Sequence, residues 1–335
     1  KVGSASVEGV TVSHSETAMA HEFSGSFSFA GVTSCRASDW KASFDKTTGF
    51  LSSYSAGGAE MLAGPLTPEF ARAPVENDMG ARMHDRMAVW RYPSFNLKKL
   101  NVSEESGSWL VSAEYEPIAS GAAAIVLEYK VYPDGTLECR EIMKDAGDLS
   151  KAPDLFRYGM KFAMPGKYST VDFYGKGPWE NYCDRNSAAM TGRYIQSVSE
   201  QYHYGYARTQ ESGTHTGLKY LRVLDPAGNG LEITSDVRFS ASALPFPMNV
   251  LDCVENGTPG RENKSNTQVG EPRHSLSLKS LAHENDRSEG TTYVNFDLAQ
   301  AGVGGINSWG TLPLEQYRIH AQERIFYYII RPISN

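Results

Sequence analysis

A glycine-rich stretch near the C-terminus, residues 302–310, carries one large aromatic side chain. Four of its nine residues are glycines, which give the backbone access to positive φ, and Trp309 lies near its end. Such a loop can hold an indole outward, where its flat apolar face and its N–H group suit the stacking of a sugar ring. The same residues also fit a tight turn between strands, with Trp309 anchored in a core. Both interpretations stay open on this stretch alone.

A second polar block, residues 70–80, places an arginine and two carboxylates around Pro74. Proline fixes φ and Gly80 permits a reversal, so we predict an ordered loop and not a strand. The side chains of 76–78, Glu-Asn-Asp, could bond to sugar hydroxyls or help to bind a cation. Alternatively, Arg72 and the acids tie the loop to a sheet through charge-assisted hydrogen bonds.

A third block, residues 173–185, enters a Gly-x-Gly-Pro turn and continues with Trp, Glu, Asn, Tyr, Asp and Arg. Pro178 and the lack of a strand–helix–strand context argue against a dinucleotide loop. Glu180 and Asp184 suggest a glycosidase pair, whose carboxyl groups must face each other across about 5–10 Å. Their closeness in one loop favours instead a buried network of both acids with arginine.

The next block, residues 202–213, combines tyrosines with His203, and His215 follows closely. His203 could titrate near neutral pH. Neither histidine has metal-ligand spacing to another His, Cys or Asp, so a metal site is weakly supported and a structural role is favoured. The sequence also lacks a serine–histidine–aspartate pattern, a nucleophile elbow and a phosphate loop.

Composition places the chain among globular proteins, with 335 residues, 40% of them hydrophobic and 21% charged. The net charge of −7 argues against a nucleic-acid partner and against an anionic membrane surface. No apolar run approaches the ~20 residues of a membrane helix. We therefore expect a soluble protein, and leave open whether it is cytoplasmic or periplasmic/secreted. Because it starts at Lys1, we expect a mature product or a piece of a longer chain.

The four cysteines are widely spaced and include no Cys-x-x-Cys pair, which argues against a zinc site and against a disulfide framework.

Strand signals dominate the chain. The clearest is Ile125–Tyr132, where apolar side chains recur at every second residue before a Pro-Asp-Gly turn and a returning strand, Thr136–Met143. Further strands are predicted at Trp40–Phe44, Phe50–Tyr54, Tyr220–Leu224, Leu231–Thr234 and Arg324–Arg331. No strand–helix alternation appears, which excludes an eightfold α/β barrel. We predict one all-β domain over residues 1–335, a large and mainly antiparallel sandwich with a loop insertion at 255–273.

Five blocks occur in a fixed order, and their motifs are specific. They are the Trp40 strand with its hairpin, Phe-x-Arg-Ala-Pro-x-x-Asn-Asp-x-Gly at 70–80, Tyr-Gly-x-Gly-Pro-x-Glu-Asn-Tyr-x-Asp-Arg at 174–185, Tyr-x-Arg-x-Gln-Glu-x-Gly at 206–213 and Gly-x-Gly-Gly-x-Asn-Ser-Trp at 302–309. Together they resemble the C-terminal, small-chain region of glycoside hydrolase family 2 β-galactosidases of the LacZ type, over about residues 40–331. The resemblance implies a large antiparallel supersandwich of the galactose-mutarotase type.

In whole enzymes of this family the two catalytic glutamates lie on a central (β/α)₈ barrel, and no segment of this chain resembles that barrel. The resemblance therefore implies a non-catalytic domain that completes the galactoside-binding site of the barrel. The parent would hydrolyse terminal β-D-galactosides with retention, and the isolated chain would be inactive. The implied partners are the barrel, the other domains and the galactoside, and a homo-oligomer is compatible with them. No cofactor is expected here, because the Mg and Na that such parents often use are bound mainly by other domains.

The resemblance also implies substrate-binding residues. Trp309 matches the tryptophan that serves as a stacking platform, and Asn307 lies beside it. Asn77, Asp78 and Gly80 match a mobile segment at the mouth of the site. No catalytic residue and no metal ligand is assigned. Other matching positions are assigned first to structure, namely Glu180, Asn181, Asp184, Arg185, Gln210 and Glu211.

Three positions depart from the family pattern. Gln300 and Ala301 stand where a histidine and a methionine are frequent, and Ile306 stands where an acidic residue is usual. All three lie close to Trp309 in sequence, so the polar contacts around the sugar are expected to differ.

Two other functions stay open. A free-standing carbohydrate-binding module would bind sugar saturably as the isolated chain. An aldose 1-epimerase, which shares the implied fold, would need a histidine acid and a carboxylate base that face one pocket. His84, His203 and His215 are available for it, but none lies in a stretch that resembles mutarotase active-site motifs.

Overall fold

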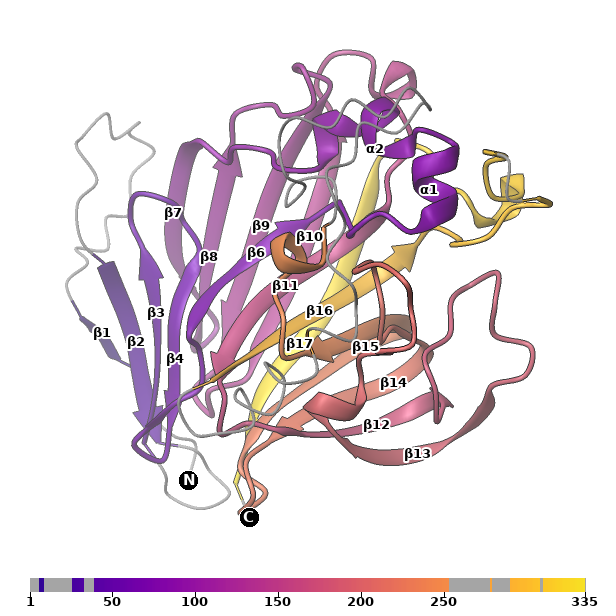
Figure 1. The fold of residues 1–335 in the computed structure, drawn as a ribbon. Helices are drawn as coiled ribbons and strands as arrows, with labels where there is room; N and C mark the ends of the chain where they lie inside the picture. The colour runs from indigo at the N-terminus through magenta and orange to yellow at the C-terminus, as the bar shows by residue number, and fades with distance from the viewer. Residues whose placement is uncertain are drawn as a thin grey trace.

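The computed structural model describes residues 6–8, 26–32, 39–252, 278, 290–307 and 310–334 (Figure 1). Strands dominate these residues, and every strand pair among them is antiparallel. The all-β, antiparallel class predicted from the sequence is therefore confirmed. The predicted insertion at 255–273 lies outside the described residues.

The strands have the following bounds: β1 Ser6–Glu8, β2 Ser26–Val32, β3 Asp39–Asp45, β4 Leu51–Ala56, β5 Ala59–Glu60, β6 Gly64–Glu69, β7 Leu97–Glu105, β8 Ser108–Tyr115, β9 Ala123–Val131, β10 Leu137–Asp145, β11 Arg157–Pro165, β12 Thr170–Gly177, β13 Met190–Ser197, β14 His215–Leu224, β15 Gly230–Leu244, β16 Thr291–Gln300 and β17 Arg324–Ile333. The helices are short: α1 Glu76–Gly80, α2 Met83–Arg86 and α3 Met248–Leu251, with 3-10 turns η1 Ala88–Trp90, η2 Leu149–Lys151, η3 Val198–Glu200 and η5 Glu315–Tyr317. Within the described ranges, none of these helices is long and apolar enough to cross a membrane.

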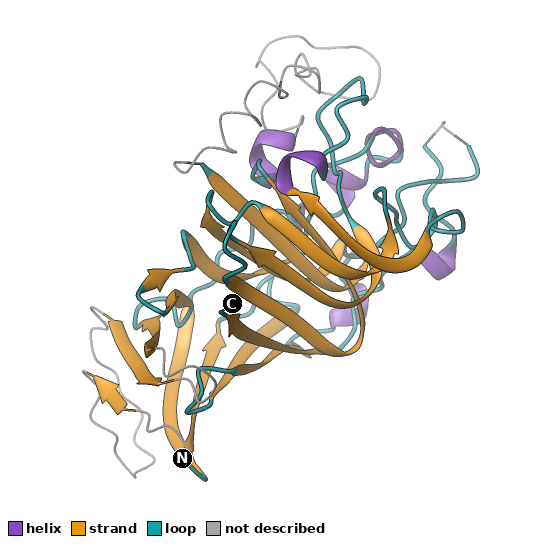
Figure 2. Ribbon diagram, turned by 90° about the horizontal axis from the view of Figure 1, so that it is seen from below, coloured by secondary structure: helices purple, strands orange, loops and turns teal. Residues whose placement is uncertain are grey.

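The strands form two antiparallel runs that share one long strand. The first run has the order β7-β8-β9-β10-β17-β15-β14-β12-β13. The second has the order β15-β16-β11-β6-β4-β3-β2-β1. Gly230–Ser235 of β15 pairs with β17, and Ser240–Leu244 pairs with β16. One strand therefore serves both runs and joins them into a single curled structure, seen from below in Figure 2.

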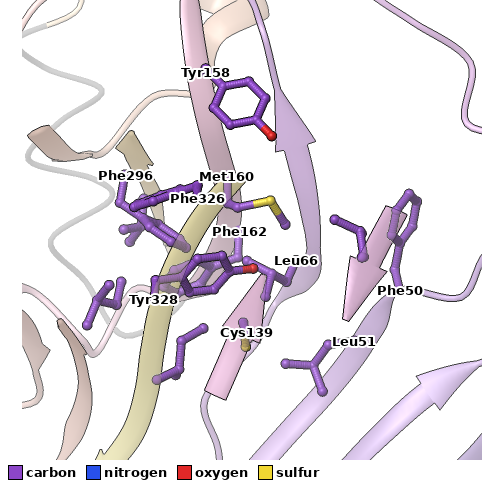
Figure 3. Close-up of a cluster of buried hydrophobic side chains, with 14 of the residues drawn as sticks. Phe50, Leu51, Leu66, Cys139, Tyr158, Met160, Phe162, Phe296, Phe326 and Tyr328 are labelled. Atoms are coloured by element: carbon purple, nitrogen blue, oxygen red, sulfur yellow. The ribbon is translucent and has the colours of Figure 1, made fainter. Parts of the chain in front are cut away.

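The core fills the space between the two runs. Figure 3 shows Leu51, Leu66 and Phe162 of the second run beside Cys139 and Tyr328 of the first. All five side chains are at least 96% buried. This packing follows from the period-two pattern, because each strand turns alternate residues inward.

The predicted hairpins are present. Strands β9 and β10 pair from Ala123 to Asp145 around the Pro-Asp-Gly turn. Its glycine, Gly135, has φ of 87°, and a Cβ there would lie 2.9 Å from the Trp40 ring. Tyr54 donates a hydrogen bond of 2.7 Å to the Gly135 carbonyl. The turn between β9 and β10 thus packs on Trp40 of β3 and Tyr54 of β4. These contacts fix the two runs against each other at this end.

Figure 1 places α1 and α2 at one end of the strands, beside the C-terminal segment that follows β16. The segment 70–80, predicted as an ordered loop and not a strand, ends in one helical turn, α1. Pro74 precedes this turn, and the Asp78 carboxylate accepts the backbone N–H of Val75 at 3.0 Å. This local hydrogen bond favours the helical turn, since it satisfies an amide at a helix start.

One buried acid lies where the alternating pattern calls for an apolar side chain. Glu141 of β10 occupies the inward row between Cys139 and Met143, and it is fully buried. Neither of its carboxyl oxygens has a hydrogen-bond partner among the described residues. Burial, with the nearby carboxylates of Asp297 and Glu69, holds the pKa of Glu141 well above its usual range. Burial likewise raises the pKa of Asp297 to about 8. Between the ordinary and the raised pKa values, the folded chain therefore keeps protons on these two carboxyl groups that the unfolded chain releases.

Glu141→Gln tests this assignment. A carboxyl whose pKa is raised by folding contributes full stability below its ordinary pKa, and this contribution is lost as the pH rises towards the raised value. We expect the unfolding free energy of the wild type to fall between pH 5 and 7.5. In Glu141→Gln the fall should be smaller by up to about 1.4 kcal/mol per pH unit, the effect of one proton. Urea unfolding of the wild type and of Glu141→Gln at several pH values measures the two slopes. Glu128→Gln, on the half-exposed face of β9, should keep the wild-type slope. Equal slopes in wild type and Glu141→Gln would show that Glu141 is ionised in the fold.

Candidate functional site

The site is built on a buried arginine, Arg72, which lies just before α1. Its guanidinium is fully buried and forms two hydrogen bonds with the Asp78 carboxylate, at 3.1 and 2.9 Å. A buried cation is tolerated only when it is paired and its remaining donors are satisfied. The Asp78 carboxylate provides this pairing, so it fixes α1 to the preceding segment. The sequence allowed two interpretations of residues 70–80. The one in which charge-assisted hydrogen bonds hold the segment in place describes Arg72 and Asp78.

The same guanidinium reaches the glycine-rich stretch. It donates to the carbonyl of Ala301 and, at 2.8 Å, to the carbonyl of Gly302. The Asn77 amide donates to the Val303 carbonyl at 3.3 Å. The helix α1 and the start of the stretch are thus held to each other by three hydrogen bonds from side chains.

Glycines are required in this stretch because other backbone and side-chain atoms approach closely. A Cβ on Gly302 would lie 2.6 Å from a carboxylate oxygen of Asp184. Gly310 has φ of 90°, and a Cβ there would lie 2.3 Å from the Gly80 carbonyl oxygen. The two ends of the stretch therefore contact two different segments, and the far end contacts the last residue of α1.

Asp184 holds the middle of the stretch. Its carboxylate accepts the backbone N–H groups of Val303 at 3.1 Å and of Gly304 at 2.7 Å. Sequence reasoning placed Asp184 in a network with arginine, and instead it serves backbone amides. This use was missed because hydrogen bonds to backbone amides leave no side-chain partner to recognise in a sequence.

Four of the five predicted substrate-binding residues lie at one edge of the fold. Asn77, Asp78 and Gly80 belong to α1, and Asn307 lies on the stretch that packs against it. Asn307 is exposed, and its side-chain oxygen accepts a hydrogen bond of 2.8 Å from Thr311. Trp309 lies outside the described residues. Both Asp78 oxygens are engaged with Arg72 and Val75, so its own contact with substrate stays a prediction.

A cleft of about 210 Å³ opens beside α1. It is lined by Val75, Glu76, Asn77, Tyr182, Arg185, Tyr206, Gln210, Glu211 and Val303. Glu211 forms part of the wall and is buried. It accepts hydrogen bonds from Arg157 at 2.9 Å and from Gln300 at 3.0 Å. The block 206–213 and the block 70–80, which are far apart in sequence, therefore line one cleft.

Glu180 holds two of the residues that line this cleft, Arg185 and Tyr206. Its carboxylate accepts hydrogen bonds from Arg185 at 2.7 Å, from Ser212 at 2.8 Å, from the Gly213 amide at 2.8 Å and from Tyr206. The predicted pairing of Glu180 with arginine is thus present. Burial and the Glu180 carboxylate raise the pKa of Tyr206 to about 12, so its hydroxyl keeps its proton and donates. With four donors around it, Glu180 is a structural acceptor in this arrangement.

Among the residues that the structure describes, no group of three or more His, Cys, Asp and Glu side chains is arranged to hold a metal ion. The expectation that this chain binds no cofactor stays a prediction.

A family model described as the β-galactosidase small chain matches residues 36–330. The chain is 27% identical to the β-galactosidase of Priestia megaterium over 285 residues, which are 84% of this chain and 25% of that protein. It is also 27% identical to the β-galactosidase of Halalkalibacterium halodurans over 288 residues, 85% of this chain and 26% of that protein. The chain thus spans about a quarter of the length of these relatives.

Solved structures with a similar outline include a galactose mutarotase related enzyme from Lactobacillus acidophilus, with 6% identity and a TM-score of 0.40 over 88% of this chain and 95% of that chain. An aldose epimerase homologue from C. elegans has 8% identity and a TM-score of 0.37 over 88% of this chain and 96% of that chain. Similarity at this level carries no conclusion about activity.

The Arg72 tie makes a direct prediction about stability. Arg72→Met leaves the Asp78 carboxylate buried without its cation, which should lower the unfolding free energy by about 3–5 kcal/mol. Arg82→Met is the matched control, since Arg82 and Asp85 form a pair that is about half exposed, at 55% and 49%. Exposed pairs contribute about 0–1 kcal/mol, so the control should lose little. Urea unfolding compares the two variants, and equal losses would contradict the structural role given to Arg72.

Proposed function

The chain belongs to the β-galactosidase small-chain family, and from this premise we propose that it is a non-catalytic domain that completes the galactoside-binding site of a catalytic barrel absent from this chain. The parent would hydrolyse terminal β-D-galactosides with retention. The chain covers 25% of the length of a relative named as a β-galactosidase, which leaves room for the barrel and other domains. These domains are the proposed partners, together with the galactoside.

One observation carries the proposal: buried Arg72 ties α1 to the stretch that bears Trp309. The Arg72–Asp78 pair is buried, so it leaves other residues of both segments exposed and able to contact a ligand. Gly80 is exposed and Asn77 is half-buried. A binding edge needs side chains fixed by supporting contacts, and this arrangement supplies such support for two segments at once.

We assign Trp309 the role of a stacking platform for the galactoside, with Asn307 and Asn77 as hydrogen-bonding neighbours. Gly80 permits close approach of substrate at the end of α1, and Asp78 acts mainly by holding that helix. A retaining barrel would cleave the glycosidic bond with its own acid/base and nucleophile carboxylates through a covalent intermediate. Mg and Na, where the parent uses them, would be held mainly by other domains.

The carboxylates of this edge support a binding role. Asp78, Asp184 and Glu180 each accept hydrogen bonds from fixed donors. A general acid or nucleophile must face the scissile bond with a carboxyl group that can exchange its proton or form a bond. Carboxylates engaged in this way are poorly suited to that task.

The aldose 1-epimerase alternative finds less support at its histidines. Burial lowers the pKa of His215 to about 4, and burial also lowers the pKa of His84. A histidine acid must be protonated near neutral pH, and both groups would be neutral there. A polarimetric assay of galactose mutarotation tests this alternative, and acceleration by the chain would support it.

Complementation tests the proposed function. The 335-residue chain should not hydrolyse a chromogenic β-galactoside, because the catalytic pair lies elsewhere in the parent. Addition of the separately produced barrel portion should restore hydrolysis. Activity of the chain alone would overturn the proposal, since a catalytic pair would then exist among its loops.

In the complemented enzyme, Trp309→Ala should raise KM about three- to tenfold and change kcat less, because stacking binds the substrate before the chemical step. Leu314→Ala is the matched control: it removes a side chain that is 49% exposed, follows the same stretch and lines neither cleft. An unchanged KM in Trp309→Ala, or an equal rise of KM in both variants, would contradict the stacking role.

A further inference from the structure

The most exposed of the large apolar side chains that the structure describes belongs to Trp179, which follows β12 and is 80% exposed. Its backbone is held firmly in place. Gln196 donates to the Pro178 carbonyl at 3.1 Å, and buried Asn181 donates to the Trp179 carbonyl at 3.0 Å. Asn181 also donates to the Lys176 carbonyl at 2.9 Å. The turn is thus anchored on both sides of the indole, while the indole itself packs little against the domain.

A cleft of about 430 Å³ lies at this indole. Its lining combines aromatic and polar side chains: Pro178, Trp179, Glu180, Arg185, Gln196, Glu200, Gln201, Tyr202, His203, Tyr206 and His215. A cleft of this size is large enough for a small organic ligand. It is about twice the volume of the cleft beside α1, at about 430 against about 210 Å³.

The polar part of this cleft is preorganised by a chain of hydrogen bonds. Gln201 donates to the Gln196 side-chain oxygen at 2.8 Å, and the Nε2 of His215 lies 2.9 Å from the Gln201 side-chain oxygen. Because an amide oxygen only accepts, the His215 Nε2–H is the donor in this contact. Glu200 is fixed at its place by Ser197, whose amide and hydroxyl each donate at 2.8 Å. The amide and carboxylate groups therefore have defined directions before a ligand arrives.

The combination of groups selects the ligand class. An exposed, anchored indole offers a flat apolar face, which matches the C–H face of a pyranose ring. Amide, imidazole and carboxylate groups beside it can exchange hydrogen bonds with hydroxyls. Glu180 and Glu200 disfavour phosphate or carboxylate ligands, since the one lining cation, Arg185, is already paired with Glu180. A neutral saccharide fits these conditions.

We propose that the cleft beside Trp179 is a second carbohydrate-binding site, separate from the edge formed by α1 and residues 302–307, and that it takes a neutral pyranoside with its ring stacked on the Trp179 indole. Both clefts are lined by Arg185 and Tyr206, and the hydrogen bonds of Glu180 hold these two side chains together. The two sites are thus neighbours with a common wall. The proposal rests on the contacts at Trp179 and does not depend on the role given to Trp309.

The test uses the 335-residue chain, with methyl β-galactoside and lactose as probes in calorimetric and ligand-observed NMR titrations. Trp179→Ala should raise Kd about three- to tenfold, because it removes the stacking face. Trp179→Phe should recover part of the affinity. Ile195→Ala is the matched control, since Ile195 is 60% exposed on the following strand, β13, and does not line the cleft. Its Kd should match the wild type.

The variants also separate this proposal from the proposed function. Trp309→Ala should leave binding at the Trp179 cleft unchanged. Loss of all sugar binding in Trp309→Ala, with Trp179→Ala unaffected, would overturn the second site and leave the proposed function intact. Loss in Trp179→Ala alone supports the second site whatever the outcome of the complementation assay. Circular dichroism should show an unchanged fold in each variant.

A final measurement distinguishes a sugar from another domain as the occupant. The difference in acrylamide quenching between wild type and Trp179→Ala reports the accessibility of the Trp179 indole. This difference should persist when the barrel portion is added and should shrink when lactose is added. Protection by the barrel portion without sugar would overturn the proposal, because the cleft would then be an interface between domains.

Discussion

The arrangement of the candidate site depends on one buried ion pair. Arg72 and Asp78 neutralise each other, and two further Arg72 N–H groups donate to carbonyls 229 and 230 residues away. A guanidinium without these partners would be costly to bury. The helix α1 and the glycine-rich stretch therefore cannot separate without exposing or unpairing this charge. An interaction of two side chains in the interior thus determines how two surface segments lie relative to each other.

A second buried arginine supports the same stretch from further inside. Arg157 contacts Glu211, which also binds the side chain of Gln300, the residue just before the stretch. Gln300 and Ala301 are both buried, so their departure from the family pattern changes the support beneath the stretch. Ile306 is different, because it is exposed and so changes the surface that faces a ligand. The three departures therefore act in two physically distinct ways.

The sequence predicted most of the framework and only part of the site. The alternation of apolar and polar side chains in Ile125–Tyr132, with the Pro-Asp-Gly turn after it, was enough to predict the β9–β10 hairpin. Both are local signals, because they depend only on residues close together in the sequence. The inward position of Glu141 follows from the same alternation, but no local signal explains why an acid stands there. The use of Asp184 for backbone amides and the Trp179 cleft depend on contacts between distant segments. Such contacts become visible only when the fold brings the segments together.

The side chains around the two clefts differ in whether their hydrogen-bonding groups are already engaged within the fold. The carboxylates of Asp78, Asp184 and Glu180 are engaged by arginine, hydroxyl or amide donors, so they already accept hydrogen bonds within the fold. Exposed groups at the clefts include the Trp179 indole, the His203 ring and the half-exposed Arg185 guanidinium, besides the carboxylates of Glu76 and Glu200. Aromatic and hydrogen-bonding surfaces bind neutral ligands without breaking their bonds. Three acids are thus engaged within the fold while the Trp179 indole is exposed, an arrangement that agrees with the binding role proposed above.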